Sequence, residues 1–262
     1  MSGSVKDKVI IVTGAGRGLG TAIAGDLARN GARVAIADVN SNNAASVAEQ
    51  IKQAGGDAIS IAADVSDRQQ VKAMIAKVVE KFGRLDVLFN NAGVSQTCPF
   101  MEVTEDDFNR IMKINALGVL IGTQEAVRQM IRQGHGGKII NTASIAGKQG
   151  WPDYAHYCAS KFAVVSLTQS AARSFAKHGI TVNCFSPGVV ATELWKQLDD
   201  DALQHGITSK PEQLINEFSA NVLLGRVSVP KDIIGTTTFL ASDASDYITG
   251  QTIMVDGGMV LI

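Results

Sequence analysis

The chain has 262 residues, of which 45% are hydrophobic and 19% charged, and its formal net charge is −1. This balance is typical of a folded globular protein and argues against a polybasic surface for nucleic acid or a charged membrane surface. No apolar run approaches the roughly 18 residues of a membrane helix, so we expect no membrane span. The three cysteines are scattered, which favours a reducing compartment. We therefore expect a cytoplasmic protein without a nucleic-acid partner or a metal.

Short β-branched runs alternate with longer helical patterns along most of the chain. The expected strands are Val9–Val12, Arg33–Ala37, Ala58–Ala62, Val87–Asn90, Lys138–Asn141, Ile180–Phe185 and Thr252–Val255. The expected helices include Gly20–Asn30, Asn43–Ala54, Gln69–Phe82, Gly118–Gln133 and one that starts at Tyr154. This alternation predicts an α/β fold, a Rossmann-like doubly wound parallel sheet with helices on both faces. No linker or repeat divides the chain, so residues 1–262 are expected to form a single domain.

One region, residues 190–226, departs from the alternation. It is polar, contains Trp195, and has only weak helical patterns near Glu193–Leu198 and Pro211–Phe218. A long excursion inside a compact domain is usually functional, so a substrate lid is the preferred interpretation and a solvated insertion the alternative. Its acidic run Asp199–Asp201 is expected to be a solvated loop rather than a metal site.

A glycine-rich turn follows the first expected strand. Its pattern is T-G-x-x-x-G-x-G, formed by Thr13, Gly14, Gly18 and Gly20, with Leu19 in the gap. Glycines between a first strand and a first helix let the backbone approach a pyrophosphate, which the helix N-terminus attracts. A merely structural turn is the alternative, but this position in the chain favours a dinucleotide site.

The second expected strand leads to Asp38. A carboxylate there can accept hydrogen bonds from the adenosine ribose hydroxyls and repels a 2′-phosphate. Arg17 is the counter-argument, since a basic side chain in the glycine turn could reach such a phosphate. Val39 adds no second positive charge, so NAD is favoured over NADP.

Tyr157 is the tyrosine that has a lysine, Lys161, four positions later. Residues i and i+4 share one face of a helix, and a nearby ammonium is expected to lower the pKa of the phenol. A surface pair is the alternative. The context favours chemistry, because Ser144 follows an expected strand at the sheet edge where ligands of doubly wound folds bind. A hydrolase triad on Ser144 is disfavoured, since no G-x-S-x-G elbow surrounds it.

Taken in chain order, these motifs resemble the short-chain dehydrogenase/reductase family over nearly the whole sequence. The motifs that carry the resemblance are Thr13-Gly14…Gly18-x-Gly20, Asp64-Val65, Asn90-Asn91-Ala92-Gly93, Asn115, Ser144, Tyr157-x-x-x-Lys161 and Pro187-Gly188. The resemblance implies catalysis by Ser144, Tyr157 and Lys161, with Asn115 anchoring a water that links Lys161 to solvent. A satisfied core amide is the alternative for Asn115.

The resemblance also implies a set of cofactor contacts. Asp64 and Val65 would flank the adenine, Asn91 and Gly93 would lie along the cofactor, and Lys161 would bond the nicotinamide ribose. The nicotinamide carboxamide would be held by Pro187, Gly188, Val190 and Thr192. The activity implied is NAD-dependent hydride transfer between nicotinamide and a secondary alcohol or ketone.

The sequence says less about the substrate. Gly134–Asn141 and the C-terminal stretch from Asp246 resemble members that act on sugar alcohols or on 2,3-butanediol and acetoin, so a small polyol or vicinal diol is the leading prediction. Many such members have glutamine after the serine, where this chain has Ile145. With Trp151 and Trp195 expected near the pocket, a less polar cyclic alcohol, steroid or 3-oxoacyl substrate is the alternative. A non-catalytic NAD-binding protein is the remaining one.

The family resemblance further implies a homotetramer. The apolar end of the chain, Met259–Ile262, is unusual for a free tail. We expect it to pack at a subunit contact and to help close a neighbouring pocket.

Overall fold

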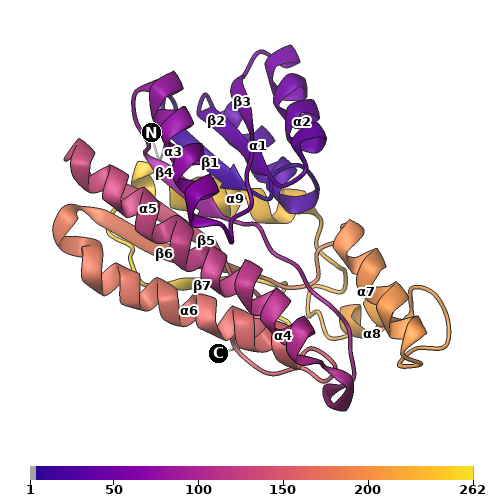
Figure 1. The fold of residues 1–262 in the computed structure, drawn as a ribbon. Helices are drawn as coiled ribbons and strands as arrows, with labels where there is room; N and C mark the ends of the chain where they lie inside the picture. Colours follow the sequence, from indigo (N-terminus) through magenta and orange to yellow (C-terminus); the bar gives the residue numbers. More distant parts are fainter. Residues whose placement is uncertain (1–3, 262) are drawn as a thin grey trace.

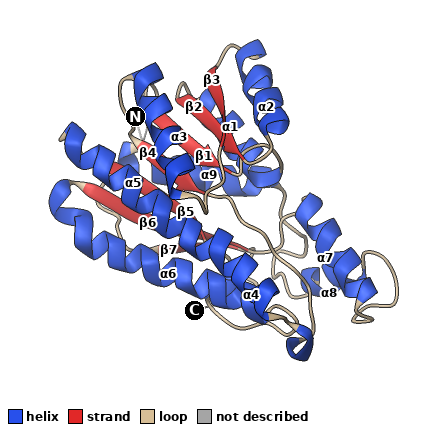
Figure 2. Cartoon of the chain, in the orientation of Figure 1, coloured by secondary structure: helices blue, strands red, loops and turns tan. Residues whose placement is uncertain are grey.

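The computed structural model describes residues 4–261, drawn in Figures 1 and 2. These residues form one seven-stranded parallel sheet in the order β3-β2-β1-β4-β5-β6-β7. The strands are β1 (Val9–Thr13), β2 (Arg33–Asp38), β3 (Asp57–Ala62), β4 (Val87–Asn90), β5 (Gly137–Thr142), β6 (Ile180–Pro187) and β7 (Thr252–Val255). The predicted single-domain α/β fold with a doubly wound sheet is confirmed.

Helices cover both faces of this sheet. Their bounds are α1 (Gly18–Arg29), α2 (Ser41–Gln53), α3 (Arg68–Phe82), α4 (Glu105–Met112), α5 (Gly118–Gln133), α6 (Ala155–Phe175), α7 (Glu193–Gln204), α8 (Gln213–Ser219) and α9 (Pro230–Ala241). In Figure 2, α5 and α6 cross in front of the strands and α9 lies behind them. Within residues 4–261, none of the helices is both long enough and apolar enough to cross a membrane.

The strand β1 shows how the sequence produces these layers. All five of its residues are buried, as expected for a parallel strand covered on both faces. Ile10 and Val12 pack in the core that includes α1, α2 and α9. Val9 and Ile11 point the other way, into the core that includes α3 and α5. Alternate side chains therefore bind the sheet to both helical layers.

Polar caps explain why two helices begin earlier than the apolar pattern indicated. The Asn40 side chain accepts hydrogen bonds from the backbone N–H groups of Asn42 and Asn43, so α2 starts at Ser41. Asp67 caps α3 in the same way, through the N–H groups of Gln69 and Gln70. A capping side chain satisfies N–H groups that the first turn leaves free.

The order of the strands places the site. The sheet grows from β1 toward β2 and β3 on one side and toward β4 to β7 on the other. Connections after β1 and β4 therefore leave the sheet in opposite directions, which opens a crevice at their carboxyl ends.

Residues 190–226 form a separate unit over this edge, built on α7 and α8 (Figure 1). The unit leaves and rejoins the sheet at one point, because Val190 and Ser228 form a parallel bridge. The Ser228 N–H donates to the Val189 carbonyl at 3.0 Å, and the Ser228 hydroxyl donates to the same oxygen at 2.7 Å. The base of the segment is therefore fixed.

The expectation of a solvated loop at the acidic run is wrong. Its three residues lie in α7, and Asp199 is only 6% exposed. The Asp199 carboxylate accepts hydrogen bonds from the backbone N–H of Leu214, at 3.0 Å, and of Glu212. It thus caps α8 and ties the two helices together. Among the described residues, no group of three or more His, Cys, Asp and Glu side chains is placed to hold a metal.

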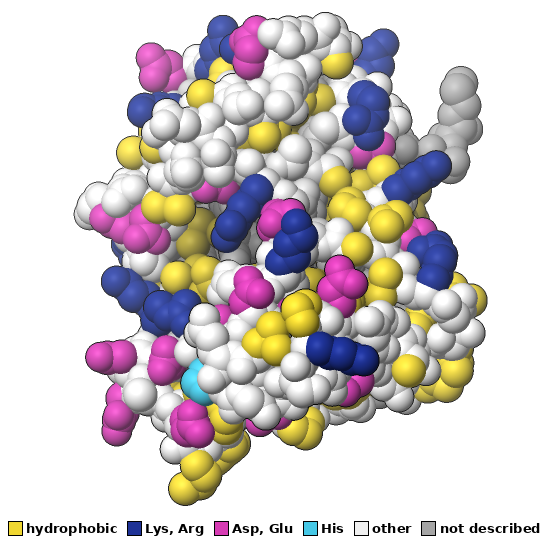
Figure 3. Space-filling view, turned by 90° about the vertical axis from the view of Figure 1, so that its right-hand side faces the viewer, with side chains coloured by type: hydrophobic (Ala, Val, Ile, Leu, Met, Phe, Trp, Pro, Cys, Tyr) yellow, Lys and Arg dark blue, Asp and Glu magenta, His cyan; other side chains and the backbone are white. Residues whose placement is uncertain are grey.

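Figure 3 shows the face on the side of α7 and α8. Basic and acidic side chains are mixed over this face, and no large block of one sign appears. Charge on this face therefore offers no extended footprint for a polyanion.

Candidate active site

The turn between β1 and α1 is shaped by its glycines. Gly14 has a φ of +62°, and a Cβ placed on it would lie 2.7 Å from the Ala92 Cα. A Cβ on Gly20 would collide with the Gly14 carbonyl. Gly18, with a φ of +60°, has nothing within 4 Å of its Cβ position and faces open space. The turn is therefore tightly packed at Gly14 and Gly20 and open at Gly18.

The N-terminus of α1 has no side-chain cap. Its free N–H groups and the positive end of the helix dipole are thus left for a ligand. A pyrophosphate fits such a site, because it needs donors and close backbone approach rather than side chains.

Asp38 ends β2 beside this turn. Its carboxylate accepts hydrogen bonds from the Gly16 N–H and the Asn40 N–H, each at 2.9 Å. These bonds hold the carboxylate at the cavity, where it and Arg17 both form part of the wall. Each carboxylate oxygen keeps a further lone pair for an incoming hydroxyl. Val39, which is 76% exposed, adds no charge of its own.

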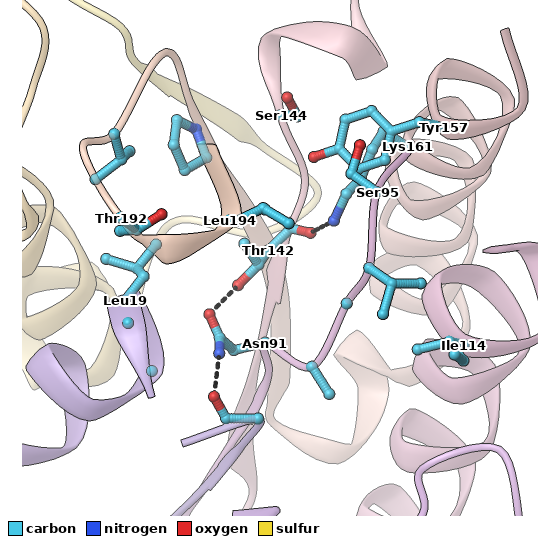
Figure 4. Close-up of a pocket in the computed structure, with 18 of the residues that line it drawn as sticks. Leu19, Asn91, Ser95, Ile114, Thr142, Ser144, Tyr157, Lys161, Thr192 and Leu194 are labelled. Atoms are coloured by element: carbon cyan, nitrogen blue, oxygen red, sulfur yellow. Dashed lines mark hydrogen bonds between the residues drawn. The ribbon is translucent and has the colours of Figure 1, made fainter. Parts of the chain in front are cut away.

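Asn91 joins the carboxyl ends of three strands. Its amide donates to the Thr13 carbonyl at 2.9 Å and accepts from the Thr142 hydroxyl at 3.2 Å. Figure 4 shows the bond between Asn91 and Thr142 at the floor of the site. The strand ends β1, β4 and β5 are thereby held at a fixed spacing.

Ser144, Tyr157 and Lys161 meet beyond this floor (Figure 4). Ser144 follows β5, and its hydroxyl accepts from the Ala146 N–H at 3.2 Å. Tyr157 and Lys161 lie one turn apart on α6. The Lys161 ammonium donates to the Thr142 carbonyl at 2.8 Å, and it lies 5.6 Å from the centre of the Tyr157 ring.

The expected lowering of the Tyr157 pKa is not found in the ligand-free protein. Burial raises the pKa of Tyr157 to about 12, although the hydrogen bond with Ser144 acts in the opposite direction. Burial also lowers the pKa of Lys161 to about 8. Both charged forms lose water in this site, and that loss is the largest cause of each shift. The prediction from spacing alone omitted this cost.

Asn115 lies behind the cavity wall rather than in it. It belongs to a π-turn, Lys113–Leu117, just before α5. Its amide donates to the Val94 carbonyl at 2.8 Å and to the Ser160 hydroxyl at 3.0 Å, and accepts from the Val94 N–H at 2.9 Å. The side chain is therefore satisfied within the protein, as the core-amide alternative expected. It anchors the loop after β4 to α6.

Gly93 separates Asn115 from Lys161. A Cβ on Gly93 would lie 3.3 Å from Asn115 Oδ1 and 3.7 Å from Lys161 Nζ. A larger residue would therefore fill the space between these two groups.

The far end of the cavity is aromatic and apolar. The Phe218 ring of α8 lies 5.3 Å from Trp151, 5.3 Å from Trp195 and 5.9 Å from Tyr154, measured between ring centres. Ile145, directly after Ser144, is buried and also lines the cavity. This end offers mainly apolar surface to a ligand.

The structure brings nearly all of the predicted site residues into one cavity of about 400 Å³. Those that line it are Gly14, Arg17, Gly18, Leu19, Gly20, Asp38, Asp64, Val65, Asn91, Gly93, Ser144, Ile145, Trp151, Tyr157, Lys161, Pro187, Gly188, Val190, Thr192 and Trp195. Asn115 is the exception. Lining residues that the sequence analysis missed include Ser95, Tyr154, Leu194, Leu198 and Phe218. They belong to no motif, and the isolated apolar residues of the otherwise polar segment 190–226 were the signal that could have indicated Leu194, Leu198 and Phe218.

Comparison with known proteins agrees with this geometry. The family described as "Enoyl-(Acyl carrier protein) reductase" matches residues 14–260. The L-2,3-butanediol dehydrogenase of Corynebacterium glutamicum is 43% identical over 256 residues, which cover 97% of this chain and 98% of the relative. The sorbitol dehydrogenase of Cereibacter sphaeroides is 41% identical over 251 residues, 96% of each chain.

A solved structure gives the same result. The short-chain type dehydrogenase/reductase of Mycobacterium marinum superposes with a TM-score of 0.89 at 36% identity, over 99% of this chain and 98% of that one. Sequence, fold and arrangement of the cavity thus agree with the resemblance drawn from the motifs. The chain belongs to the short-chain dehydrogenase/reductase family of nicotinamide-dependent oxidoreductases.

Proposed function

We propose that the protein is an NAD-dependent oxidoreductase that moves a hydride between nicotinamide and a secondary alcohol or ketone, with a small vicinal diol or polyol as substrate. The observation that carries this proposal is the continuous cavity that joins the glycine turn after β1 to Ser144, Tyr157 and Lys161. The names of the 2,3-butanediol and sorbitol dehydrogenases among the relatives support the substrate class.

The proposed cofactor contacts follow the cavity from end to end. The Gly14–Gly20 turn would hold the pyrophosphate, and Asp38 the adenosine ribose. Asp64 and Val65 would flank the adenine. The nicotinamide end would rest against the wall residues Asn91, Gly93, Lys161, Pro187, Gly188, Val190 and Thr192. When bound, the cofactor supplies a nicotinamide ring that accepts the hydride in oxidation and returns it in reduction.

The protein's own part is orientation and proton transfer. The Ser144 hydroxyl fixes the substrate oxygen, and Tyr157 takes the hydroxyl proton in oxidation or gives a proton in reduction. The Lys161 ammonium, 5.6 Å from the Tyr157 ring centre, would favour the phenolate form and so act against burial, which raises the pKa of Tyr157. The space beside Gly93 supports a water between Lys161 and Asn115 that would carry the proton outward.

The apolar part of the cavity supports a second candidate for the substrate class. Ile145, Trp151, Trp195 and Phe218 give the pocket an apolar wall, which suits a cyclic alcohol, a steroid or a 3-oxoacyl ketone. Residues 190–226 would cover either substrate as a lid, since Leu194, Trp195 and Phe218 of this segment line the cavity.

Initial rates of NADH formation test these alternatives. We expect turnover of 2,3-butanediol, sorbitol or galactitol with NAD, and little with cyclohexanol or a hydroxysteroid. Turnover of the bulky apolar alcohols alone would move the assignment to the second candidate. NAD binding without turnover of any of the five would instead mean a non-catalytic NAD-binding protein.

The preference for NAD is expected to depend on Asp38. Asp38→Asn keeps an oxygen for the Gly16 N–H but removes the charge that repels a 2′-phosphate. The ratio of kcat/KM with NAD to kcat/KM with NADP should fall about tenfold or more. Arg17→Ala is the matched control and should weaken use of NADP without affecting NAD. A purified wild-type enzyme that prefers NADP would contradict the assignment.

The proposal extends to a homotetramer in the cytoplasm. A homotetramer is supported by exposed apolar side chains on α5 and α6, among them Ile131 and Phe162, and sedimentation would measure it directly. At the C-terminus Val260 is buried and Leu261 is exposed, so Leu261 is free to meet a second subunit, while Ile262 lies outside the described residues. The three buried free thiols support a reducing compartment such as the cytoplasm.

A further inference from the structure

Ser95 carries a hydroxyl that the mechanism above does not use. The residue is 1% exposed, lines the cavity, and its hydroxyl has no hydrogen-bond partner within residues 4–261. Figure 4 labels Ser95 together with Ser144 and Tyr157, which line the same cavity. Buried hydroxyls normally find a partner, and this one has none among the described residues.

The backbone around Ser95 is held from two sides. On the sheet side, Asn115 bonds both the N–H and the carbonyl of Val94. On the side of residues 190–226, the Gln197 amide donates to the Ser95 carbonyl at 3.3 Å. Asp201 accepts from the Thr97 N–H at 3.3 Å. The hydroxyl is therefore presented from a fixed loop, and little ordering is needed when a ligand arrives.

We propose that the Ser95 hydroxyl binds a second oxygen of the substrate, on the carbon next to the reacting one. This inference rests on the proposed function, in which Ser144 and Tyr157 share the reacting oxygen. A further hydroxyl in the wall of the same cavity is then available for another substrate oxygen. The substrates are thus vicinal diols and the corresponding hydroxyketones or diketones.

The chemistry of the donor supports this assignment over the other free polar group. Trp151 also has an unpartnered ring N–H in the cavity wall, but an indole can only donate. A serine hydroxyl can donate to a carbonyl and accept from an alcohol. Ser95 can therefore hold the second oxygen of a diketone, a hydroxyketone or a diol alike.

The rest of the pocket limits the number of substrate oxygens. The apolar part of the cavity wall includes Ile145, Leu194, Leu198 and Phe218, and the wall also contains Glu193 and Tyr154. Any hydroxyl of a hexitol that met the apolar part of the wall would be buried against side chains that cannot bond it, which is costly. Two neighbouring oxygens with small alkyl groups fit this wall better than a polyol does.

Ser95→Ala tests the proposal with two substrate pairs that differ only in the second oxygen. The pairs are acetoin against 2-butanone, and 2,3-butanediol against 2-butanol. For the unmodified enzyme we expect kcat/KM to favour the first member of each pair. The variant should lower kcat/KM for the first member about tenfold, the worth of one hydrogen bond, and change the second less than twofold.

Two further variants separate binding from structure. Ser186→Ala removes another buried hydroxyl without a partner, at 0% exposure and outside the cavity wall, so both members of each pair should respond alike. Ser95→Thr keeps the hydroxyl and should keep the preference, even if the added methyl lowers both rates.

The outcomes distinguish this inference from the function on which it rests. An unchanged preference in Ser95→Ala, an equal loss for both members of a pair, or faster turnover of sorbitol than of 2,3-butanediol by the unmodified enzyme would overturn the role of Ser95 alone. No turnover of any alcohol or ketone by the unmodified enzyme would overturn both proposals. A preference that collapses in Ser95→Ala and survives in Ser95→Thr and Ser186→Ala is the expected result.

Discussion

Tyr157→Phe is expected to lower kcat about a thousandfold, the usual contribution of a general acid–base residue. The substitution keeps the aromatic ring and removes only the hydroxyl that exchanges the proton. Binding of NADH, measured by its fluorescence, should stay within a few fold of the unmodified enzyme. The loss should appear in both directions of the reaction, since reduction reverses the steps of oxidation.

The control for this variant is Tyr247→Phe. Tyr247 is fully exposed and is not among the residues that line the cavity. Its hydroxyl should therefore be dispensable. Retention of more than a tenth of the activity by Tyr157→Phe would show that another group handles the proton. Loss of NADH binding in the same variant would show that the hydroxyl holds the cofactor rather than the substrate.

Lys161→Met is expected to remove turnover and to stabilise the ligand-free protein at neutral pH. Burial lowers the pKa of Lys161 from 10.5 to about 8, so the folded state disfavours the charged form. Between these two values the unfolded chain binds more protons, and the contribution of Lys161 to stability rises with pH through that window. At pH 7 the gain from methionine should be about 2 kcal/mol, less than the full shift because the bond to the Thr142 carbonyl is lost.

Urea unfolding of both proteins from pH 7 to pH 10 measures this effect. The difference in the free energy of unfolding should shrink as the pH rises above about 8, where the native lysine loses its charge. The buried thiol of Cys158, whose pKa is raised by burial, titrates in both proteins and cancels in the difference. The pKa of Cys184 is also raised by burial, but Lys161 acts in the opposite direction, so loss of Lys161 raises it further and the comparison is cleanest below the range in which thiols titrate. If the free energies of unfolding of the two proteins instead change with pH in parallel, the buried Lys161 ammonium does not destabilise the folded state.

Most of the fold could be predicted because the strands are local signals. A parallel strand buried on both faces reads as a short run of β-branched residues, as at Val9–Val12. The end of β6 was harder to predict, because the strand continues to Pro187, where it pairs with Val255 of β7. That pairing joins residues distant in sequence, and no local pattern reports it.

The candidate site divides in the same way. The glycine turn and the pair Tyr157 and Lys161 could be predicted, because backbone conformation and helical spacing leave a pattern in a few consecutive residues. The aromatic contacts of Phe218 and the capping role of Asp199 depend on how α7 and α8 fold over the sheet. The direction of the Tyr157 pKa depends on burial, which spacing does not contain.

The shared anchor of residues 190–226 has a consequence for how such an enzyme can diversify. Since the chain departs and returns at the Val190 and Ser228 bridge, none of the strand pairings of the sheet runs through the segment between them. Mutations, insertions or a transplanted segment between these two residues therefore change the walls around the substrate while β1, β2 and the glycine turn keep their geometry. Apart from Val190 and Thr192 at the proposed nicotinamide end, substrate range can therefore change in this segment while recognition of the adenosine half of the cofactor stays with β1, β2 and the glycine turn.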